Sequence, residues 1–185
     1  MKSNKTARPR WLVTGIFLTI VLQTGVLAVE YLSSVAPLWF GKPVMLPTEP
    51  YDPRSLFRGN YVRLNYSISR VPTDIADGKF KDGQKVYLTL NMDGQQPVPV
   101  KLSATKPGEG TFIGGRIRFV SSEYYRLDYG IEAFFLPKEK ALAAERKLTS
   151  DKVSAQVYLS SDGKAALNAL YCNGEPCDLS EESGD

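Results

Sequence analysis

Residue types that carry most protein chemistry are unevenly represented in this chain of 185 residues, which contains no histidine. Nucleophile systems that use imidazole, the common histidine zinc sites and facial triads are therefore excluded. Carboxylate or serine–lysine chemistry remains. No acidic cluster has the spacing of a calcium loop, and neither a GxxxxGK nor a GxGxxG phosphate loop occurs. We expect no catalytic residue, no metal site and no cofactor.

Glu132 is the carboxylate whose setting suggests a role, because it lies within a largely apolar strand pattern, Tyr129 to Leu136 (YGIEAFFL). We expect a structural ion pair across the sheet, since a charge in such a place needs a partner. The candidate partners are Arg58, Arg63 and Arg126. A ligand contact and a catalytic role are the alternatives, and a pocket holding Glu132 or Asp128 near another titratable group would favour an enzyme.

Two of these arginines belong to the segment Tyr51 to Tyr66, YDPRSLFRGNYVRLNY, which combines a turn signal with the start of a strand. Alternation from Tyr61 to Ser69 predicts a half-buried strand with one inward face: Val62, Leu64, Tyr66 and Ile68. Gly59 and Asn60 before it predict a tight corner, because both tolerate the left-handed backbone region. The structural interpretation is a corner followed by core residues. The binding interpretation uses the open face: Arg58, Tyr61 and Arg63.

This segment resembles the opening motif of the GDYXXLXY family of bacterial membrane-anchored proteins. The residues on motif positions are Gly59, Tyr61, Leu64 and Tyr66, with Asn60 where the family has Asp. The segment Tyr129 to Pro137, with Gly130 and Glu132, resembles a second family signature, so the likeness covers roughly residues 43–170 and the anchor before them. The resemblance implies membership and no chemistry. Asn does not titrate, which weakens any acid, base or metal role at position 60.

A membrane segment precedes the motif. Trp11 to Val29 is nineteen residues without a charge, close to the ~20 that cross a bilayer as a helix. Four basic residues precede it, so the positive-inside rule keeps the amino terminus in the cytoplasm and exports everything after residue 30. We expect an uncleaved signal anchor in a bacterial inner membrane, with a periplasmic or extracellular domain. A cleaved signal peptide is the alternative, since Val26-Leu27-Ala28 offers a cleavage sequence.

Two cysteines agree with export. Cys172 and Cys177 flank the turn sequence Asn-Gly-Glu-Pro, which brings two thiols within the Cα separation of a disulfide. An oxidising compartment favours the bond. Two free thiols are the alternative.

Charge excludes nucleic acid as a partner. Of 23 Lys and Arg residues, four lie before the membrane segment, which leaves 19 against 20 Asp and Glu in the rest of the chain. The exported part therefore has a net charge of −1, without the basic field that nucleic-acid binding demands.

The remaining pattern predicts a mainly β domain, a barrel or sandwich with mostly antiparallel strands and one short helix. The expected strands are 42–47, 61–69, 85–91, 98–103, 112–120, two pieces of 124–136 bent by a bulge or close backbone approach at Gly130, and a hairpin of 153–159 with 165–171. Gly114-Gly115 is interpreted as a hairpin signal. The helix is expected over 138–148, after Pro137.

The expected organisation has five parts. They are a cytoplasmic tail (1–10), the anchor (11–29), a juxtamembrane linker (30–41) whose helical start ends at Pro37, the β domain (42–171), and a disulfide loop with an acidic, disordered tail (172–185).

Three functions fit this organisation. The first is a non-enzymatic accessory module that binds a polytopic membrane protein, because the resemblance implies that such a protein is often encoded nearby. The second is an envelope ligand-binding domain for a glycan or anionic component, with a basic and aromatic patch of Tyr61, Arg63, Tyr124 and Arg126. A concave pocket lined by these residues would favour the second, and a flat face the first. The third is a carboxylate or serine–lysine enzyme.

Overall fold

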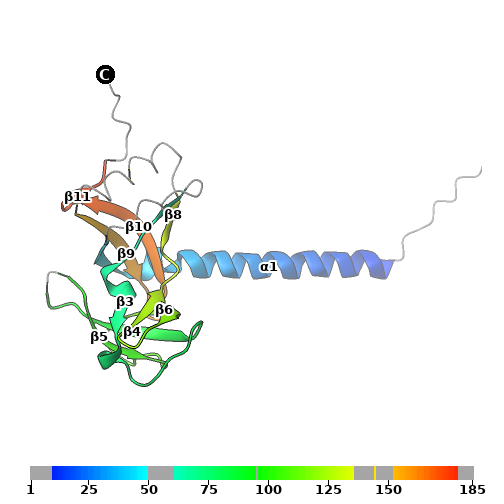
Figure 1. The fold of residues 1–185 in the computed structure, drawn as a ribbon. Helices are drawn as coiled ribbons and strands as arrows, with labels where there is room; N and C mark the ends of the chain where they lie inside the picture. Colours follow the sequence, from blue (N-terminus) through cyan, green and yellow to red (C-terminus); the bar gives the residue numbers. More distant parts are fainter. Residues whose placement is uncertain (1–9, 50–60, 95, 136–143, 145–151, 179–185) are drawn as a thin grey trace, which may run out of the picture. The chain divides into compact units, whose positions relative to one another are not determined.

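The computed structural model describes residues 10–49, 61–94, 96–135, 144 and 152–178 (Figure 1). The chain divides into two compact units, Met1–Ala36 and Pro37–Asp185. The predicted turn at Arg58, Gly59 and Asn60 and the acidic residues 179–185 lie outside the described residues. Of the predicted helix 138–148, only Ala144 is described, and it is helical and buried.

The long helix α1 runs from Arg10 to Phe40. Its apolar side chains from Trp11 to Leu32 are exposed, and the helix is long and apolar enough to cross a membrane. Pro37 does not end it, contrary to the prediction, so most of the expected linker is helical. Proline has no backbone N–H, so Pro37 cannot donate a hydrogen bond to the preceding turn of the helix. Its carbonyl still accepts a hydrogen bond from the Gly41 amide, at 2.8 Å, so the helix continues past it.

The β domain contains two larger sheets and one short strand pair, and every strand pair among the described residues is antiparallel. The first sheet has the order β1 (Lys42–Pro47), β9 (Val153–Leu159), β10 (Ala165–Cys172), β11 (Glu175–Pro176). The second has the order β3 (Arg70–Pro72), β7 (Tyr124–Asp128), β6 (Thr111–Val120), β4 (Lys85–Asn91), β5 (Val98–Ser103). Strands β2 (Tyr61–Arg63) and β8 (Ala133–Phe135) form the pair.

Single hydrogen bonds join these sheets into a nearly closed, barrel-like wall. The amide of Leu64 donates to the carbonyl of Glu132 at 2.7 Å, just beyond the β2–β8 pair. Thr48, at the end of β1, forms an isolated antiparallel bridge with Tyr66. The amide of Gly114 in β6 donates to the carbonyl of Gly163, in the β9–β10 turn, at 2.8 Å.

Most predicted strands are confirmed, but the strand expected over 61–69 is not continuous. Strand β2 ends at Arg63, Tyr66 pairs with the end of β1, and Ser67–Ser69 forms a 3₁₀ turn, η2. The segment changes partner from β8 to β1 within three residues, so it cannot keep one ladder. Its predicted inward residues are nevertheless buried, as is Ser69, which alternation placed outward.

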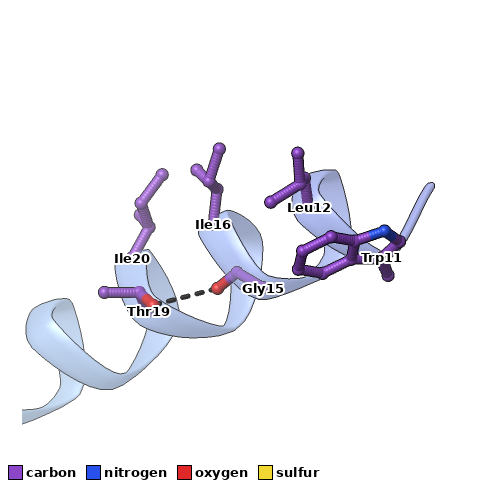
Figure 2. A pocket seen from close by; sticks show the side chains of 6 residues that line it. All are labelled: Trp11, Leu12, Gly15, Ile16, Thr19 and Ile20. Carbon is purple, nitrogen blue, oxygen red and sulfur yellow. Dashed lines mark hydrogen bonds between the residues drawn. The ribbon is translucent and has the colours of Figure 1, made fainter. Parts of the chain in front are cut away.

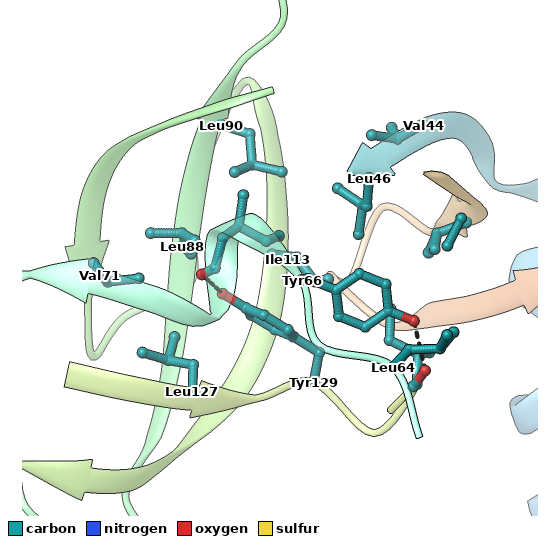
Figure 3. Packing of buried hydrophobic residues seen from close by; sticks show 14 of the residues in the cluster. Val44, Leu46, Leu64, Tyr66, Val71, Leu88, Leu90, Ile113, Leu127 and Tyr129 are labelled. Atoms are coloured by element: carbon teal, nitrogen blue, oxygen red, sulfur yellow. Dashed lines mark hydrogen bonds between the residues drawn. The ribbon is translucent and has the colours of Figure 1, made fainter. Parts of the chain in front are cut away.

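The core is mostly aliphatic, and Tyr66 and Tyr129 are set into it (Figure 3). Tyr66 and Tyr129 are buried, and each hydroxyl donates to a backbone carbonyl: Tyr66 to Ile131 at 2.6 Å and Tyr129 to Ile68 at 2.5 Å. Burial of a hydroxyl without a partner costs about 1–3 kcal/mol, so these bonds let the rings fill the core without that penalty. They also tie residues 66–68, at the end of the motif segment and just after it, to the second signature in both directions.

Gly114 and Gly115 lie inside β6, so their interpretation as a hairpin signal is wrong. A Cβ on Gly115 would lie 2.9 Å from the ring of Tyr129 and 3.0 Å from the carbonyl oxygen of Asp128. The absence of a side chain therefore lets the Tyr129 ring lie directly against the strand.

We expect the substitution Gly115→Ala to destabilise the domain by about 1–3 kcal/mol, because the methyl group overlaps a ring held on its other side by the core. Thermal unfolding of the full chain in detergent, followed by circular dichroism, measures this. The control is Gly94→Ala, where the nearest atom is 3.7 Å from the new Cβ, and which should change stability by less than about 1 kcal/mol. Equal melting temperatures for the two variants would contradict the packing argument.

Candidate functional site

A polar pocket of about 290 Å³ lies where the motif segment meets β6 and β7. Its lining combines three arginines, two carboxylates and neutral residues: Arg63, Leu64, Asn65, Ser69, Arg118, Arg126, Leu127, Asp128 and Glu132. Three guanidinium groups against two carboxylates give the pocket a net charge of +1.

The motif segment positions its polar residues by burying their neighbours. Val62 and Leu64 are buried in the core, and Arg63 pairs with Ala133 across the β2–β8 ladder. Side chains alternate along an extended chain, so anchoring the even-numbered residues directs Arg63 and Asn65 to the other side. There they line the pocket.

Glu132 is held by the backbone of its own turn. Gly130 has a φ of +83°, a conformation that glycine adopts without steric cost. The amides of Tyr129 and Gly130 both donate to the Glu132 carboxylate, the second at 2.9 Å. These two amide donors fix the orientation of the carboxylate. A Cβ on Gly130 would meet nothing within 4 Å, so this glycine is required by its conformation, and the expected close approach does not occur.

The charge of Glu132 acts on the two core tyrosines. Burial raises the pKa of Tyr66 far above its usual value, and the negative charge of Glu132 raises it further. The pKa of Tyr129 is raised by the same two causes in the same order. Both phenols therefore stay neutral and keep donating their hydrogen bonds at any physiological pH.

Each of two arginines in the pocket has a weak or long contact. Arg126 Nη2 donates to Asn65 Oδ1 at 3.3 Å, and Arg118 Nη1 lies 3.6 Å from Asp128 Oδ2. Asn65 in turn donates from Nδ2 to Glu49 Oε2 at 3.2 Å. Distances of 2.7–2.9 Å are usual for strong charge-assisted bonds. These two guanidinium groups therefore keep capacity for a further anion.

A fourth arginine lies beside the pocket. Arg70 in β3 is directly opposite Arg126 in β7, and like charges in that position are unfavourable. The guanidinium of Arg70 lies over the ring of Tyr124, 3.8 Å from its centre, which offsets part of the repulsion. An anion between the two strands would offset more of it.

The structure brings together part of the predicted site. Arg63, Arg126 and Glu132 line one pocket, while Tyr66 and Tyr129 lie in the core behind it. The backbone of Tyr61 pairs with Phe135, and Tyr124 contacts Arg70 without lining the pocket. An ion pair between Glu132 and an arginine stays a prediction.

Sequence reasoning missed three polar lining residues, Asn65, Ser69 and Arg118, whereas Asp128 had been named as a candidate carboxylate. Asn65 could have been included, because alternation put it on the open face with Arg63. Arg118 could not, since it lies at a break in the register of β6 against β7, between Ile117 and Phe119.

The predicted disulfide is confirmed: Cys172 and Cys177 are bonded, with their Cα atoms 4.9 Å apart across the turn between β10 and β11. In the described part of the chain, no group of three or more Cys, Asp and Glu residues could hold a metal ion.

The exposed surface of α1 has a crevice of about 330 Å³ beside Gly15 (Figure 2). Its walls are mostly apolar: Trp11, Leu12, Ile16, Thr19 and Ile20. The Thr19 hydroxyl donates to the Gly15 carbonyl at 2.9 Å, so this polar group is satisfied within the helix.

The sequence model described as GDYXXLXY protein matches residues 23–170, which include the end of α1 and most of the β domain. No curated protein and no solved structure matches the chain.

Proposed function

Since the chain belongs to the GDYXXLXY family, we propose that it is a membrane-anchored binding module that works outside the cytoplasm of a bacterial cell. Helix α1 supports the anchor by its length and its exposed apolar surface. The disulfide supports an oxidising compartment.

The proposed topology places the amino terminus in the cytoplasm and the β domain beyond the inner membrane. It rests on the four basic residues before the uncharged segment that begins at Trp11: Lys2, Lys5, Arg8 and Arg10.

We expect protease added to spheroplasts to digest the β domain of a chain tagged at both ends, and to leave it intact in inside-out vesicles. Both tags should remain on one chain before digestion, because the anchor is not cleaved. Protection of the domain in spheroplasts would contradict the orientation, and loss of the amino-terminal tag would indicate a cleaved signal peptide.

The proposed activity of the β domain is to bind a ligand with carboxylate or phosphate groups. The observation that carries it is the pocket lined by Arg63, Arg118 and Arg126. Guanidinium groups bind both kinds of anion through paired N–H donors. The pocket is concave and contains two of the four residues of the predicted basic patch, which favours ligand binding over a flat contact face.

A catalytic role is not part of the proposal. Glu132 and Asp128 share the pocket with each other as well as with three arginines, which meets the condition set for an enzyme. Both carboxylates already have partners: two backbone amides donate to Glu132, and Arg118 lies 3.6 Å from Asp128. Arginine stays protonated in proteins, so the three guanidinium groups favour the binding of an anion.

We expect the full chain in lipid nanodiscs to bind acetate and inorganic phosphate, and the substitution Arg126→Ala to weaken both at least tenfold, or ~1.4 kcal/mol. Titration followed by NMR chemical shifts measures the affinity. The control is Arg116→Ala, which removes an exposed arginine of β6 that donates to the Gly83 carbonyl and does not line the pocket. Equal effects of the two substitutions, or no binding by the unchanged chain, would contradict the proposal.

A second candidate function is association of α1 with a polytopic membrane protein. The supporting observation is the face of α1 that carries Gly15, Thr19 and Gln23, spaced four residues apart. Residues at this spacing lie on one side of a helix. Small residues let helix backbones approach closely in a membrane, and polar ones hydrogen-bond across the contact. The Gly15 crevice would admit a side chain of the partner helix.

A photocrosslinking amino acid placed at Thr19 should capture one membrane protein in native membranes. The same group placed at Val21 should capture none. At ~100° per residue, Val21 lies about 160° around the helix axis from Thr19. Capture from both positions, or from neither, would contradict a specific helix contact.

A further inference from the structure

The outward face of the second sheet carries an exposed aromatic residue next to the pocket. Phe119 in β6 is 50% exposed, and it lies directly opposite Arg126 in β7. Arg126 in turn lies opposite Arg70 in β3. Opposed residues of antiparallel strands point to the same face, with Cβ atoms ~4.5–5.5 Å apart. Two guanidinium groups and one phenyl ring thus form a row across three strands.

Tyr124 completes this surface. The rings of Phe119 and Tyr124 are in contact, with centres 6.3 Å apart and planes inclined at 48°. The guanidinium of Arg70 lies over the ring of Tyr124, 3.8 Å from the centre of that ring. We call Arg70, Phe119 and Tyr124 the aromatic platform. Because Arg126 belongs to both the row and the pocket lining, the platform and the pocket are continuous.

We infer that the pocket and the platform form one site for an acidic polysaccharide, in which a carboxylate or phosphate on one sugar unit enters the arginine pocket and an adjoining sugar ring stacks on Phe119. This rests on the anion binding proposed above.

The chemistry of the two parts supports this ligand class. The C–H bonds of a sugar ring carry a small positive charge, and the face of an aromatic ring carries a negative one. Phe119 and Arg126 are opposed residues, whose Cβ atoms lie ~4.5–5.5 Å apart, so neighbouring units of one ligand can reach both side chains. The guanidinium groups complement the negative charges that repeat along an acidic polysaccharide.

Comparing the affinities of free anions and sugar-linked anions distinguishes the contribution of the pocket from that of the platform. The probes for the full chain in nanodiscs are acetate with trigalacturonate, inorganic phosphate with glucose 6-phosphate, and neutral maltotriose. We expect at least one sugar-linked anion to bind about tenfold more tightly than its matching free anion, and maltotriose to bind more weakly than either. Which pair shows the gain identifies carboxylate or phosphate as the anionic group.

The substitution Phe119→Ala should remove most of that tenfold gain and leave the affinity for acetate and phosphate unchanged. Phe119→Tyr keeps the ring and should bind like the unchanged chain. The control is Val98→Ala, at an exposed residue of β5 in the same sheet. Arg126→Ala should weaken every anionic probe.

The outcomes separate this inference from the proposed function. Free anions that bind without any gain from a linked sugar would overturn the polysaccharide site and leave anion binding intact. So would a gain that Phe119→Ala and Val98→Ala reduce equally. Failure of acetate and phosphate to bind, with sugar-linked anions binding no better, would overturn both.

Discussion

The crossing of two chain segments, with Leu64 donating to the Glu132 carbonyl, is the contact on which both core and pocket depend. Tyr66 and Tyr129 reach across it in opposite directions, each donating a hydroxyl to the other segment. These bonds are buried, where an unmade bond is costly. Because the two segments are fixed against each other, the polar side chains on their outer side converge on one small space.

Glu132 links the interior to the surface. Its carbonyl belongs to the crossing, and its carboxylate, held by the amides of Tyr129 and Gly130, lies at the pocket wall. An ionised group so close to two phenols would disturb the core if they could ionise. Their raised pKa values keep the phenols neutral. A core of this kind tolerates a fixed charge at its edge, and that charge balances part of the arginine cluster.

What the sequence predicted well was local. The Asn-Gly-Glu-Pro turn was enough to predict the Cys172–Cys177 bond, and alternation placed β4 and β9 correctly. What it missed depends on distant neighbours. The strand expected over 61–69 breaks because Tyr66 pairs with Thr48, and Gly115 lies inside a strand because Tyr129 packs on it. The pocket assembles from segments some sixty residues apart, a distance over which periodicity carries no information.

The register break at Arg118 determines on which face of the sheet the Phe119 ring lies. Ile117 faces Leu127 in the core, and Phe119, two positions later, would share that inward face in an unbroken strand. The extra residue resets the phase, so Phe119 faces solvent. Deletion of Arg118 would remove the extra residue and leave Ile117 opposite Leu127 and the phenylalanine opposite Arg126, so the ring would still face outward. Loss of the irregular pairing with every residue kept would instead turn the ring toward the core. The exposed position of this ring therefore depends on how β6 pairs with β7 at one residue.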